Sequence, residues 1–190
     1  YLKIILIEYN YMTSRIKRIR NEIDDLFKNR LDDNFIYYDI DDENIEILKV
    51  LIIGTDKTPY KNGFFFFSVK FSDNYPLTPP KVWFYTTNSK VRMNPNLYNN
   101  GKVCLSIINT WGNTDNWTEK MSVRSILLSI QSMVLCDNPL KNEPGLYINK
   151  LKNNNYNKVV EYCVCNIAIL QNLKESNVNY RFENNYTNNN

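Results

Sequence analysis

The sequence predicts one α+β domain: a helix, then a four-stranded antiparallel meander, then a central helix and one or more C-terminal helices. Near the start, apolar residues recur at helical spacing. Four short runs rich in β-branched and aromatic residues follow, and turn residues separate them. Helical spacing returns later in the chain. Short strands that follow one another in this way are typical of a meander.

The composition suits a globular protein. A length of 190 residues fits one domain with extensions and can bury a sizeable core. Hydrophobic residues make up 43% of the chain, which is too many for a disordered protein. The formal net charge of +3 is too small to call for nucleic acid or a membrane, so we expect neither as a partner.

We expect three parts along the chain. Residues 1–10 form an apolar extension, residues 11–175 form the domain, and the Asn-rich residues 176–190 form a disordered tail. The apolar run Ile4–Ile7 is too short for a signal sequence or a membrane span. Because the chain starts at Tyr1 rather than Met, we interpret it as a piece of a longer protein.

The first helix is predicted from a cap at Thr13 or Ser14 to about Arg30. Its apolar stripe consists of Ile16, Ile19, Ile23, Leu26 and Phe27. Its outer face begins with the basic residues Arg15, Lys17, Arg18 and Arg20. A solvated helix face is the simplest interpretation of these charges.

Strands are predicted over residues 35–40, 45–53, 64–71 and 82–85. The aromatic block Phe64–Phe67 should be core, covered on both faces of the sheet. Three prolines fix an extended loop between Tyr75 and Pro80, and the Tyr75–Pro76 bond is a reasonable place for a cis peptide. On this loop Leu77 is either an exposed anchor for a partner or a buried plug.

Two later helices are predicted. Ser122 caps a central, buried helix over residues 123–135, whose apolar face consists of Ile126, Leu127, Ile130, Met133 and Val134. A last helix covers residues 155–173, with Val159, Val160, Cys163, Ile167 and Leu170 facing inward. We interpret Cys136, Cys163 and Cys165 as packing residues.

The chain contains no histidine, which excludes Ser–His and Cys–His catalysis and histidine metal sites. Its four cysteines are scattered and form no CxxC pair, so we predict no metal site and no disulfide framework. No glycine-rich phosphate loop is present, and we predict no cofactor.

One stretch, residues 94–107, carries the chemistry. It opens with Asn94-Pro95-Asn96, turns at Asn99-Asn100-Gly101, and then presents Cys104 in a short apolar run. A thiol placed after a turn, with a side-chain amide eight residues earlier, predicts a nucleophile with a hydrogen-bond donor folded over it. Trp111 and Trp117 follow, and we interpret both as walls of this loop.

This stretch, together with Tyr75–Val82 before it and the two tryptophans after it, resembles the ubiquitin-conjugating enzymes. The resemblance covers residues 13–173. The amino-acid sequence of residues 92–98, 101–106 and 142–145 is most similar to the subgroup of large conjugating enzymes, which includes the giant inhibitor-of-apoptosis conjugating enzyme. The ordered set of motifs carries the resemblance, since no single tripeptide is specific.

The resemblance implies roles for named residues. Cys104 falls on the active cysteine, which accepts ubiquitin or a ubiquitin-like protein as a thioester and passes it to a substrate lysine. Asn96 falls on the asparagine that stabilises the oxyanion, and it also has the simpler role of tying its own loop. Asn94 occupies the usual histidine position, which is structural. Glu143 is the candidate to orient the lysine, because Ser106 stands where many members carry an aspartate.

The resemblance also implies the partners: ubiquitin or a ubiquitin-like protein, an activating enzyme that uses the ATP, a ubiquitin ligase and a substrate protein. The helix residues Arg15, Lys17 and Arg18 would contact the activating enzyme and ligases, and Leu77 with Pro79 would contact a ligase. Thr118 and Glu119 replace the family's usual ligase-contacting turn, which leaves ligase choice open.

We expect a monomer in the cytoplasm and nucleus. The rival interpretation is a non-catalytic adaptor of the same fold that only binds ubiquitin or a ligase. An adaptor would need neither Cys104 nor Asn96, and the chain has both. A thiol hydrolase is a remote third alternative, because the chain has no histidine to serve as its base.

Overall fold

The structure is a computed structural model, and it describes residues 14–88, 90–112, 115–143, 145 and 150–174. The predicted extension over residues 1–10, the predicted tail over residues 176–190 and the alternative cap Thr13 lie outside the described residues.

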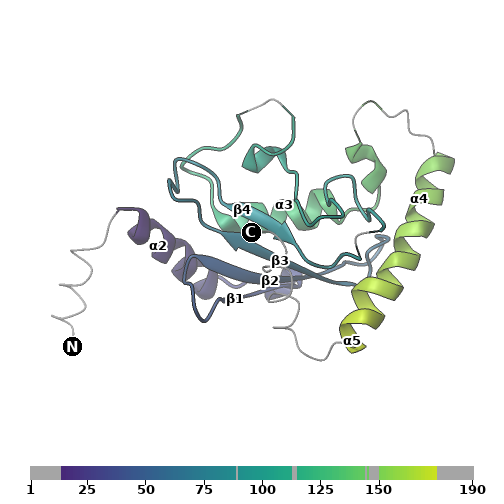
Figure 1. The fold of residues 1–190 in the computed structure, drawn as a ribbon, viewed down its shortest axis with the longest axis horizontal. Coiled ribbons are helices and arrows are strands. Elements are labelled where there is room, and N and C mark those ends of the chain that lie inside the picture. Colours follow the sequence, from purple (N-terminus) through teal and green to yellow (C-terminus); the bar gives the residue numbers. More distant parts are fainter. Residues whose placement is uncertain (1–13, 89, 113–114, 144, 146–149, 175–190) are drawn as a thin grey trace.

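The centre of the molecule is a four-stranded antiparallel sheet with strand order β1-β2-β3-β4 (Figure 1). The strands are β1 (Ile36–Ile40), β2 (Ile47–Ile53), β3 (Phe64–Lys70) and β4 (Lys81–Phe84). Each predicted strand is therefore present, with its ends within two residues of the prediction. The predicted meander is confirmed, because every strand pairs with the next one along the chain.

The aromatic block of β3 is buried on both faces of the sheet, as predicted. Phe65 and Phe67 are fully buried in the main core. Phe66 points the other way and is 6% exposed, in a second, smaller cluster with Tyr85. The rest of this second cluster consists of the partly buried Leu51, Phe64 and Trp83.

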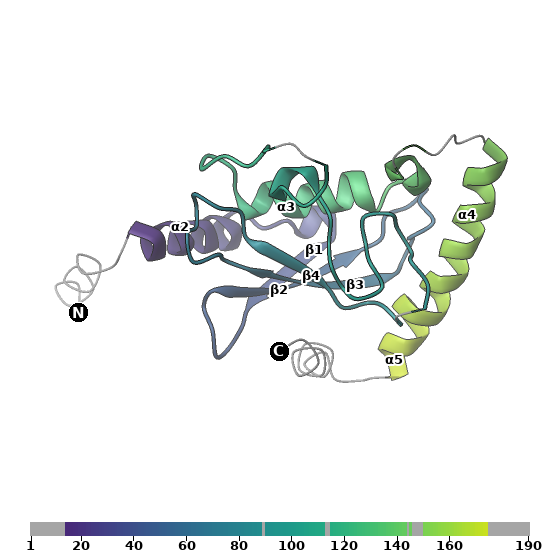
Figure 2. The same ribbon diagram turned by 45° about the horizontal axis from the view of Figure 1, so that its top comes forward.

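Helix α2 (Ser14–Lys28) lies near one end of the sheet (Figures 1 and 2). Ile19, Ile23 and Leu26 are buried in the main core, as the helical spacing predicts. Phe27 lies at the edge of this stripe and is 38% exposed, and its ring meets the ring of Tyr38 edge-on at 5.7 Å.

The central helix begins as α3 (Val123–Ser129), and the Ser122 hydroxyl caps it by accepting a hydrogen bond from the Ser125 N–H. It continues through Ile130–Val134 with wider π-type turns. Ile130 and Val134 are buried, four residues apart, whereas Met133 is 60% exposed. The prediction that Met133 faces the core is therefore wrong, because the wider turns shift the buried face from the third to the fourth residue.

The last helix is longer than predicted and lies across the end of the sheet opposite α2 (Figures 1 and 2). It runs as α4 (Lys150–Cys163), π-type turns over Val164–Gln171, and a last turn α5 (Asn172–Lys174). Val160, Cys163 and Ile167 are buried, as predicted. Val159 and Leu170 are 51% and 50% exposed, so the prediction that these two side chains face inward is wrong. None of the described helices is long and apolar enough to cross a membrane.

Candidate active site

The stretch that carries Cys104 folds as a small hairpin against β4. Backbone bridges join Leu97 to Val103, and the Gly101 N–H donates to the Tyr98 carbonyl to close the turn. The Phe84 N–H donates to the Gly101 carbonyl at 2.8 Å, which attaches the hairpin to the end of β4. Gly101 has a φ of +90°, a conformation that favours glycine. The turn predicted at this glycine is therefore present.

Cys104 and Asn96 are joined by two reciprocal hydrogen bonds. The Cys104 N–H donates to the Asn96 carbonyl at 2.9 Å, and the Asn96 Nδ2 donates to the Cys104 carbonyl at 2.7 Å. Both residues are buried. The Asn96 Oδ1 is also buried and has no hydrogen-bond partner among the described residues. The Asn96 side-chain amide therefore contacts the backbone of Cys104, and it ties its own loop.

Asn94 anchors this loop to the rest of the protein. It is fully buried, and its Nδ2 donates to the Val134 carbonyl at 2.7 Å and to the Tyr60 hydroxyl at 2.9 Å. Its Oδ1 accepts from the Asn96 N–H at 2.7 Å. The Tyr60 hydroxyl donates in turn to the Met93 carbonyl, and burial raises the pKa of this tyrosine. Asn94 therefore connects the Asn96 backbone to the C-terminal end of the central helix.

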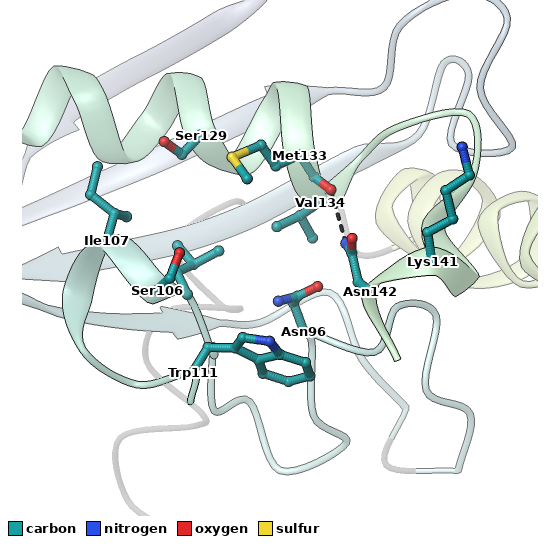
Figure 3. Close-up of a pocket in the computed structure, with 10 residues that line it drawn as sticks. Asn96, Ser106, Ile107, Trp111, Ser129, Met133, Val134, Lys141 and Asn142 are labelled. Carbon is teal, nitrogen blue, oxygen red and sulfur yellow. Dashed lines mark hydrogen bonds between the residues drawn. The ribbon is translucent and has the colours of Figure 1, made fainter. Parts of the chain in front are cut away.

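A pocket of about 420 Å³ opens beside Asn96 (Figure 3). It lies between the cysteine loop, the central helix and the segment that follows that helix. Its lining residues are Asn96, Leu105, Ser106, Ile107, Trp111, Ser129, Met133, Val134, Lys141 and Asn142. The exposure of Met133 follows from this position, because the side chain forms part of the pocket wall. The prediction that Trp111 walls the site is confirmed.

Glu143 does not line this pocket. Its Oε2 lies 3.8 Å from Arg92 Nη1, and the Arg92 guanidinium also donates to the Pro95 carbonyl. The two neighbours before Glu143, Lys141 and Asn142, do line the pocket. Glu143, the predicted acidic residue, therefore lies near the Asn94–Asn96 loop, and Arg92 lies between Glu143 and that loop.

Trp117 holds together two segments predicted to contact partners. It is 7% exposed, and its Nε1 donates to the Pro76 carbonyl at 2.7 Å. It therefore packs on the proline loop, while its backbone N–H donates to Asn109 Oδ1 at 3.0 Å, just beyond the cysteine run. It is not among the residues that line the pocket. Leu77, next on the proline loop, is 67% exposed, so it is not a buried plug. Thr118 and Glu119 are exposed, Pro79 is half-buried, and the Tyr75–Pro76 bond is cis.

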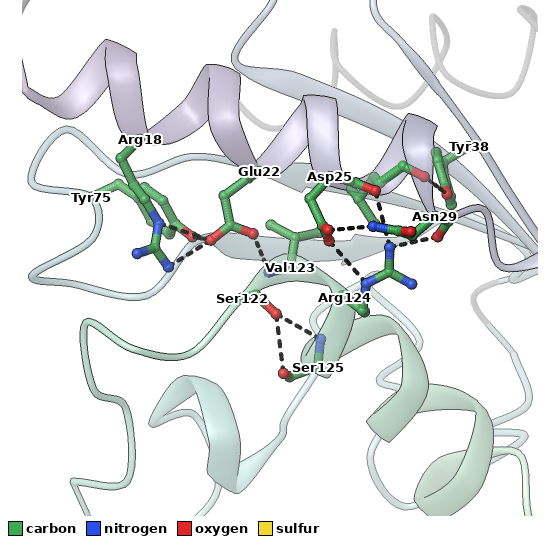
Figure 4. Close-up of polar contacts among 11 residues, drawn as sticks. Arg18, Glu22, Asp25, Asn29, Tyr38, Tyr75, Ser122, Val123, Arg124 and Ser125 are labelled. Atoms are coloured by element: carbon green, nitrogen blue, oxygen red, sulfur yellow. Dashed lines mark hydrogen bonds and ion pairs between the residues drawn. The ribbon is translucent and has the colours of Figure 1, made fainter.

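Arg15 and Arg18, which are predicted to bind partners, form ion pairs within the protein. The Arg15 guanidinium donates to both Glu46 carboxylate oxygens, at 2.5 and 2.9 Å, and to the Ser72 carbonyl. Arg18 donates to Glu22 (Figure 4). It also donates to the Met121 carbonyl at 2.8 Å. Lys17, the third basic residue in that prediction, is half-buried.

Glu22 is a buried carboxylate that the sequence prediction missed (Figure 4). Its Oε1 accepts from Arg18 and from the Tyr75 hydroxyl at 2.7 Å, and its Oε2 accepts from the Val123 N–H at 3.0 Å. Burial, and then the carboxylate itself, raise the pKa of Tyr75. The only signal in the sequence is an acidic residue directly beside the apolar stripe of α2.

The remaining cysteines are not among the residues that line the pocket. Cys163 is buried, and burial raises the pKa of its thiol. Cys136 is half-buried and Cys165 is exposed, so the packing interpretation is wrong for Cys165. Within the described parts of the chain, no group of three or more metal-ligating side chains is suitably placed to hold an ion.

The fold is an α+β domain, an antiparallel meander with flanking helices, in which an asparagine loop beside a pocket holds Cys104 by two hydrogen bonds. A sequence model described as "Ubiquitin-conjugating enzyme" matches residues 18–164. The chain therefore belongs to the ubiquitin-conjugating enzyme family, and the resemblance predicted from its motifs is confirmed.

Individual relatives agree with this family. The chain is 39% identical over 188 residues to the probable ubiquitin-conjugating enzyme protein 17 of Caenorhabditis elegans, covering 90% of this chain and 25% of the relative. It is 38% identical over 157 residues to human ubiquitin-conjugating enzyme E2 Z, covering 80% and 43%. It is 47% identical over 114 residues to the human dual E2 ubiquitin-conjugating enzyme/E3 ubiquitin-protein ligase BIRC6, covering 58% and 2%. The chain thus spans less than half the length of each.

A solved structure agrees as well. The chain is similar to the ubiquitin-conjugating enzyme E2 from Plasmodium falciparum, with 30% sequence identity and a TM-score of 0.53. The similarity covers 64% of this chain and 96% of the other. The predicted fold class is therefore confirmed.

Proposed function

We propose that Cys104 accepts ubiquitin or a ubiquitin-like protein from an activating enzyme and passes it to a substrate lysine. The observation that carries the proposal is the reciprocal pair between Asn96 and Cys104 at the edge of a pocket, in a member of this family. In the first step the Cys104 sulfur forms a thioester with the modifier, and the thiol of the activating enzyme leaves. In the second step the lysine nitrogen attacks the thioester carbonyl, the Cys104 thiol leaves, and the amine loses its proton.

We further propose that Asn96 stabilises the oxyanion that develops on the thioester carbonyl. An amide nitrogen has two hydrogens. One is used in the bond to the Cys104 carbonyl, and that bond fixes the direction of the other. One fixed amide donor at such a site is worth about 3 kcal/mol in the transition state.

The contacts with partners are also proposals. Leu77 and Pro79 would meet a ligase together with Thr118 and Glu119, and the Trp117–Pro76 hydrogen bond supports their acting as one surface. Lys17 would contact the activating enzyme. Because internal ion pairs engage Arg15 and Arg18, we propose that they act mainly by shaping this end of α2.

Glu143 remains a proposal as the residue that orients the lysine, and its pairing with Arg92 would hold the carboxylate near the cysteine loop. The protein would act as a monomer in the cytoplasm and nucleus. ATP would be used by the activating enzyme only.

A charging assay tests the proposed function. The protein is incubated with ATP, an activating enzyme and ubiquitin, and is run on gels with and without a thiol reductant. We expect a reductant-sensitive adduct that disappears in Cys104→Ala. Cys165→Ala is the matched control, because Cys165 is an exposed cysteine on the last helix, and it should charge like wild type.

Discharge to lysine separates the role of Asn96. We expect Asn96→Ala still to charge and to discharge about 100-fold more slowly, because the variant lacks the proposed donor to the oxyanion that forms when the amine attacks the thioester. No adduct with several activating enzymes and modifiers, from a folded protein, would reject the proposal in favour of the adaptor. An adduct that survives in Cys104→Ala would reject Cys104 as the acceptor.

A further inference from the structure

We propose that Arg92 is a positioning residue for the transfer step: its guanidinium fixes the Pro95 peptide and thereby aims the Asn96 amide. This inference rests on the proposed function, but it concerns a residue outside the Asn96–Cys104 pair. Among the described residues, Arg92 forms no hydrogen bond with Cys104, and we assign it no direct role in the chemistry.

The guanidinium is held on three sides. One Nη atom donates to the Pro95 carbonyl, and the other lies 3.8 Å from the Glu143 carboxylate. Its carbon lies 4.1 Å from the centre of the Tyr98 ring, which is cation–π contact distance. The Nε atom is buried without a hydrogen-bond partner among the described residues. The guanidinium is therefore held through its two Nη atoms and through the stacking of its flat face on the Tyr98 ring.

The backbone of Arg92 is also fixed. Its carbonyl accepts a hydrogen bond from the Tyr156 hydroxyl of α4 at 3.1 Å. The next residue, Met93, is 1% exposed, and its carbonyl accepts from the Tyr60 hydroxyl. The side chain therefore extends from a backbone that is tied to α4. The side chain itself joins the cysteine loop to the segment that follows the central helix.

The hydrogen bond from Arg92 to the Pro95 carbonyl affects the orientation of the peptide that joins Pro95 to Asn96. A proline has no N–H, so its carbonyl is its only polar backbone group, and Pro95 is buried. The peptide that begins with this carbonyl ends at the nitrogen of Asn96, which donates to the Asn94 side chain. The guanidinium and the Asn94 amide therefore fix the two sides of one peptide plane. Releasing one side lets the plane rotate, and the Asn96 side chain rotates with it.

An arginine is needed for this arrangement. Its planar fork can donate to one group, pair with a second and stack on a ring at the same time, whereas a lysine ammonium is a point charge on a flexible stem. Arg92→Lys keeps the positive charge near Glu143 but loses the stacked plane. It should therefore restore the function only in part.

The first experiment measures single-turnover discharge. Wild type, Arg92→Ala, Arg92→Lys and the control Arg124→Ala are fully charged on Cys104, and the loss of thioester is followed over a range of lysine concentrations. Arg124 is a matched control because its guanidinium likewise forms an ion pair and donates to backbone carbonyls. Its partners are Asp25 of α2 and Asn29 just after that helix, far along the chain from the cysteine loop. We expect Arg92→Ala to charge like wild type and to discharge about 10- to 100-fold more slowly at saturating lysine. Arg92→Lys should fall between the two, and Arg124→Ala should match wild type.

The double variant tests whether Arg92 acts through Asn96. If it does, Arg92→Ala slows discharge strongly in the wild-type background but adds no further slowing in Asn96→Ala. Equal slowing in both backgrounds would overturn the proposal. So would wild-type discharge by Arg92→Ala, or a loss of charging in parallel with a lower melting temperature.

A second measurement needs no activating enzyme, so it separates this inference from the proposed function. The Cys104 N–H, which donates to the Asn96 carbonyl, reports the loop geometry through its hydrogen exchange with solvent. We expect its protection to fall at least 10-fold in Arg92→Ala and to stay unchanged in Arg124→Ala. Unchanged protection in Arg92→Ala would overturn the proposal, whether or not the wild-type protein forms a thioester.

Discussion

At the scale of single residues, Gly101 shows how closely the cysteine hairpin is attached to the sheet. A methyl group at its Cα would lie 2.4 Å from Trp83 Nε1 and 2.8 Å from the Phe84 carbonyl oxygen. The φ of +90° adds backbone strain for any other residue. We expect Gly101→Ala to lower the free energy of unfolding by about 3 kcal/mol, from the strain and the overlap together.

Gly112→Ala is the control for this prediction. Gly112 also has a positive φ, of +75°, but no described residue lies within 4 Å of its added methyl group. It should therefore cost only the backbone strain, about 1 kcal/mol. Urea denaturation measures both variants, and equal losses would show that Trp83 makes no close contact with the turn.

At the scale of elements, Glu22 joins α2 to the start of α3 through one buried carboxylate. Glu22→Gln keeps the shape but replaces one carboxylate oxygen with a donor. That donor would face the Val123 N–H or the Arg18 guanidinium, both of which need an acceptor. We expect the free energy of unfolding to fall by about 2 kcal/mol, because a buried donor loses its partner while Arg18 retains some solvent.

Asp24→Asn is the matched variant on the same helix. Asp24 is exposed, so the loss of its charge should change stability by less than about 0.5 kcal/mol. Chemical denaturation compares the two variants, and a Glu22→Gln variant as stable as Asp24→Asn would contradict the role of Glu22 as a tie between helices.

The elements also show where sequence patterns are sufficient. The stripe of α2 follows a regular helical repeat, so its buried residues could be predicted from spacing alone. The repeat does not hold through Ile130–Val134 and Val164–Gln171, where wider turns change which residues share a face. Met133 and Leu170 were placed wrongly for this reason, since a regular helical period gives no sign of π-type turns.

At the scale of the whole molecule, stability should depend on pH in the acid range. The hydrogen bond from Arg15, followed by its charge and that of Lys70, holds the pKa of Glu46 below its ordinary value. Asn29 and Arg124 do the same for Asp25. A carboxyl with a lowered pKa contributes stability above the pKa of the unfolded chain, about 4, and this contribution is lost as the pH falls toward the folded pKa. We expect the melting temperature to drop between about pH 5 and pH 3.

Glu46→Gln should make that drop shallower, because the variant has no proton to take up at this position. At pH 7 it should be less stable than wild type by about 0.5–1 kcal/mol, since the pair is only partly buried. Glu161→Gln, at an exposed position of α4, should keep the wild-type slope. Thermal unfolding across this pH range is the measurement, and parallel curves for wild type and Glu46→Gln would contradict the assignment.

Across the molecule, local features were predictable and long-range ones were not. The strands, Gly101, Cys104 and Asn96 are marked by patterns within a few residues. Glu22 contacts Tyr75 and Val123, which lie 53 and 101 positions away, so no local pattern reveals it. Arg92 stands only four positions before Asn96, but its meaning depends on Glu143 and Tyr156. The roles of such residues can be recognised only in the folded structure, where their partners lie next to them.

The loop around Cys104 is fixed by amides, hydroxyls, backbone carbonyls and a guanidinium. None of these groups ordinarily takes up or releases a proton between about pH 5 and 8. The hydrogen bonds that fix this loop should therefore stay unchanged across this pH range. A discharge-rate profile recorded over that interval reads the ionisation of the incoming amine, without a conformational signal from these groups superimposed on it.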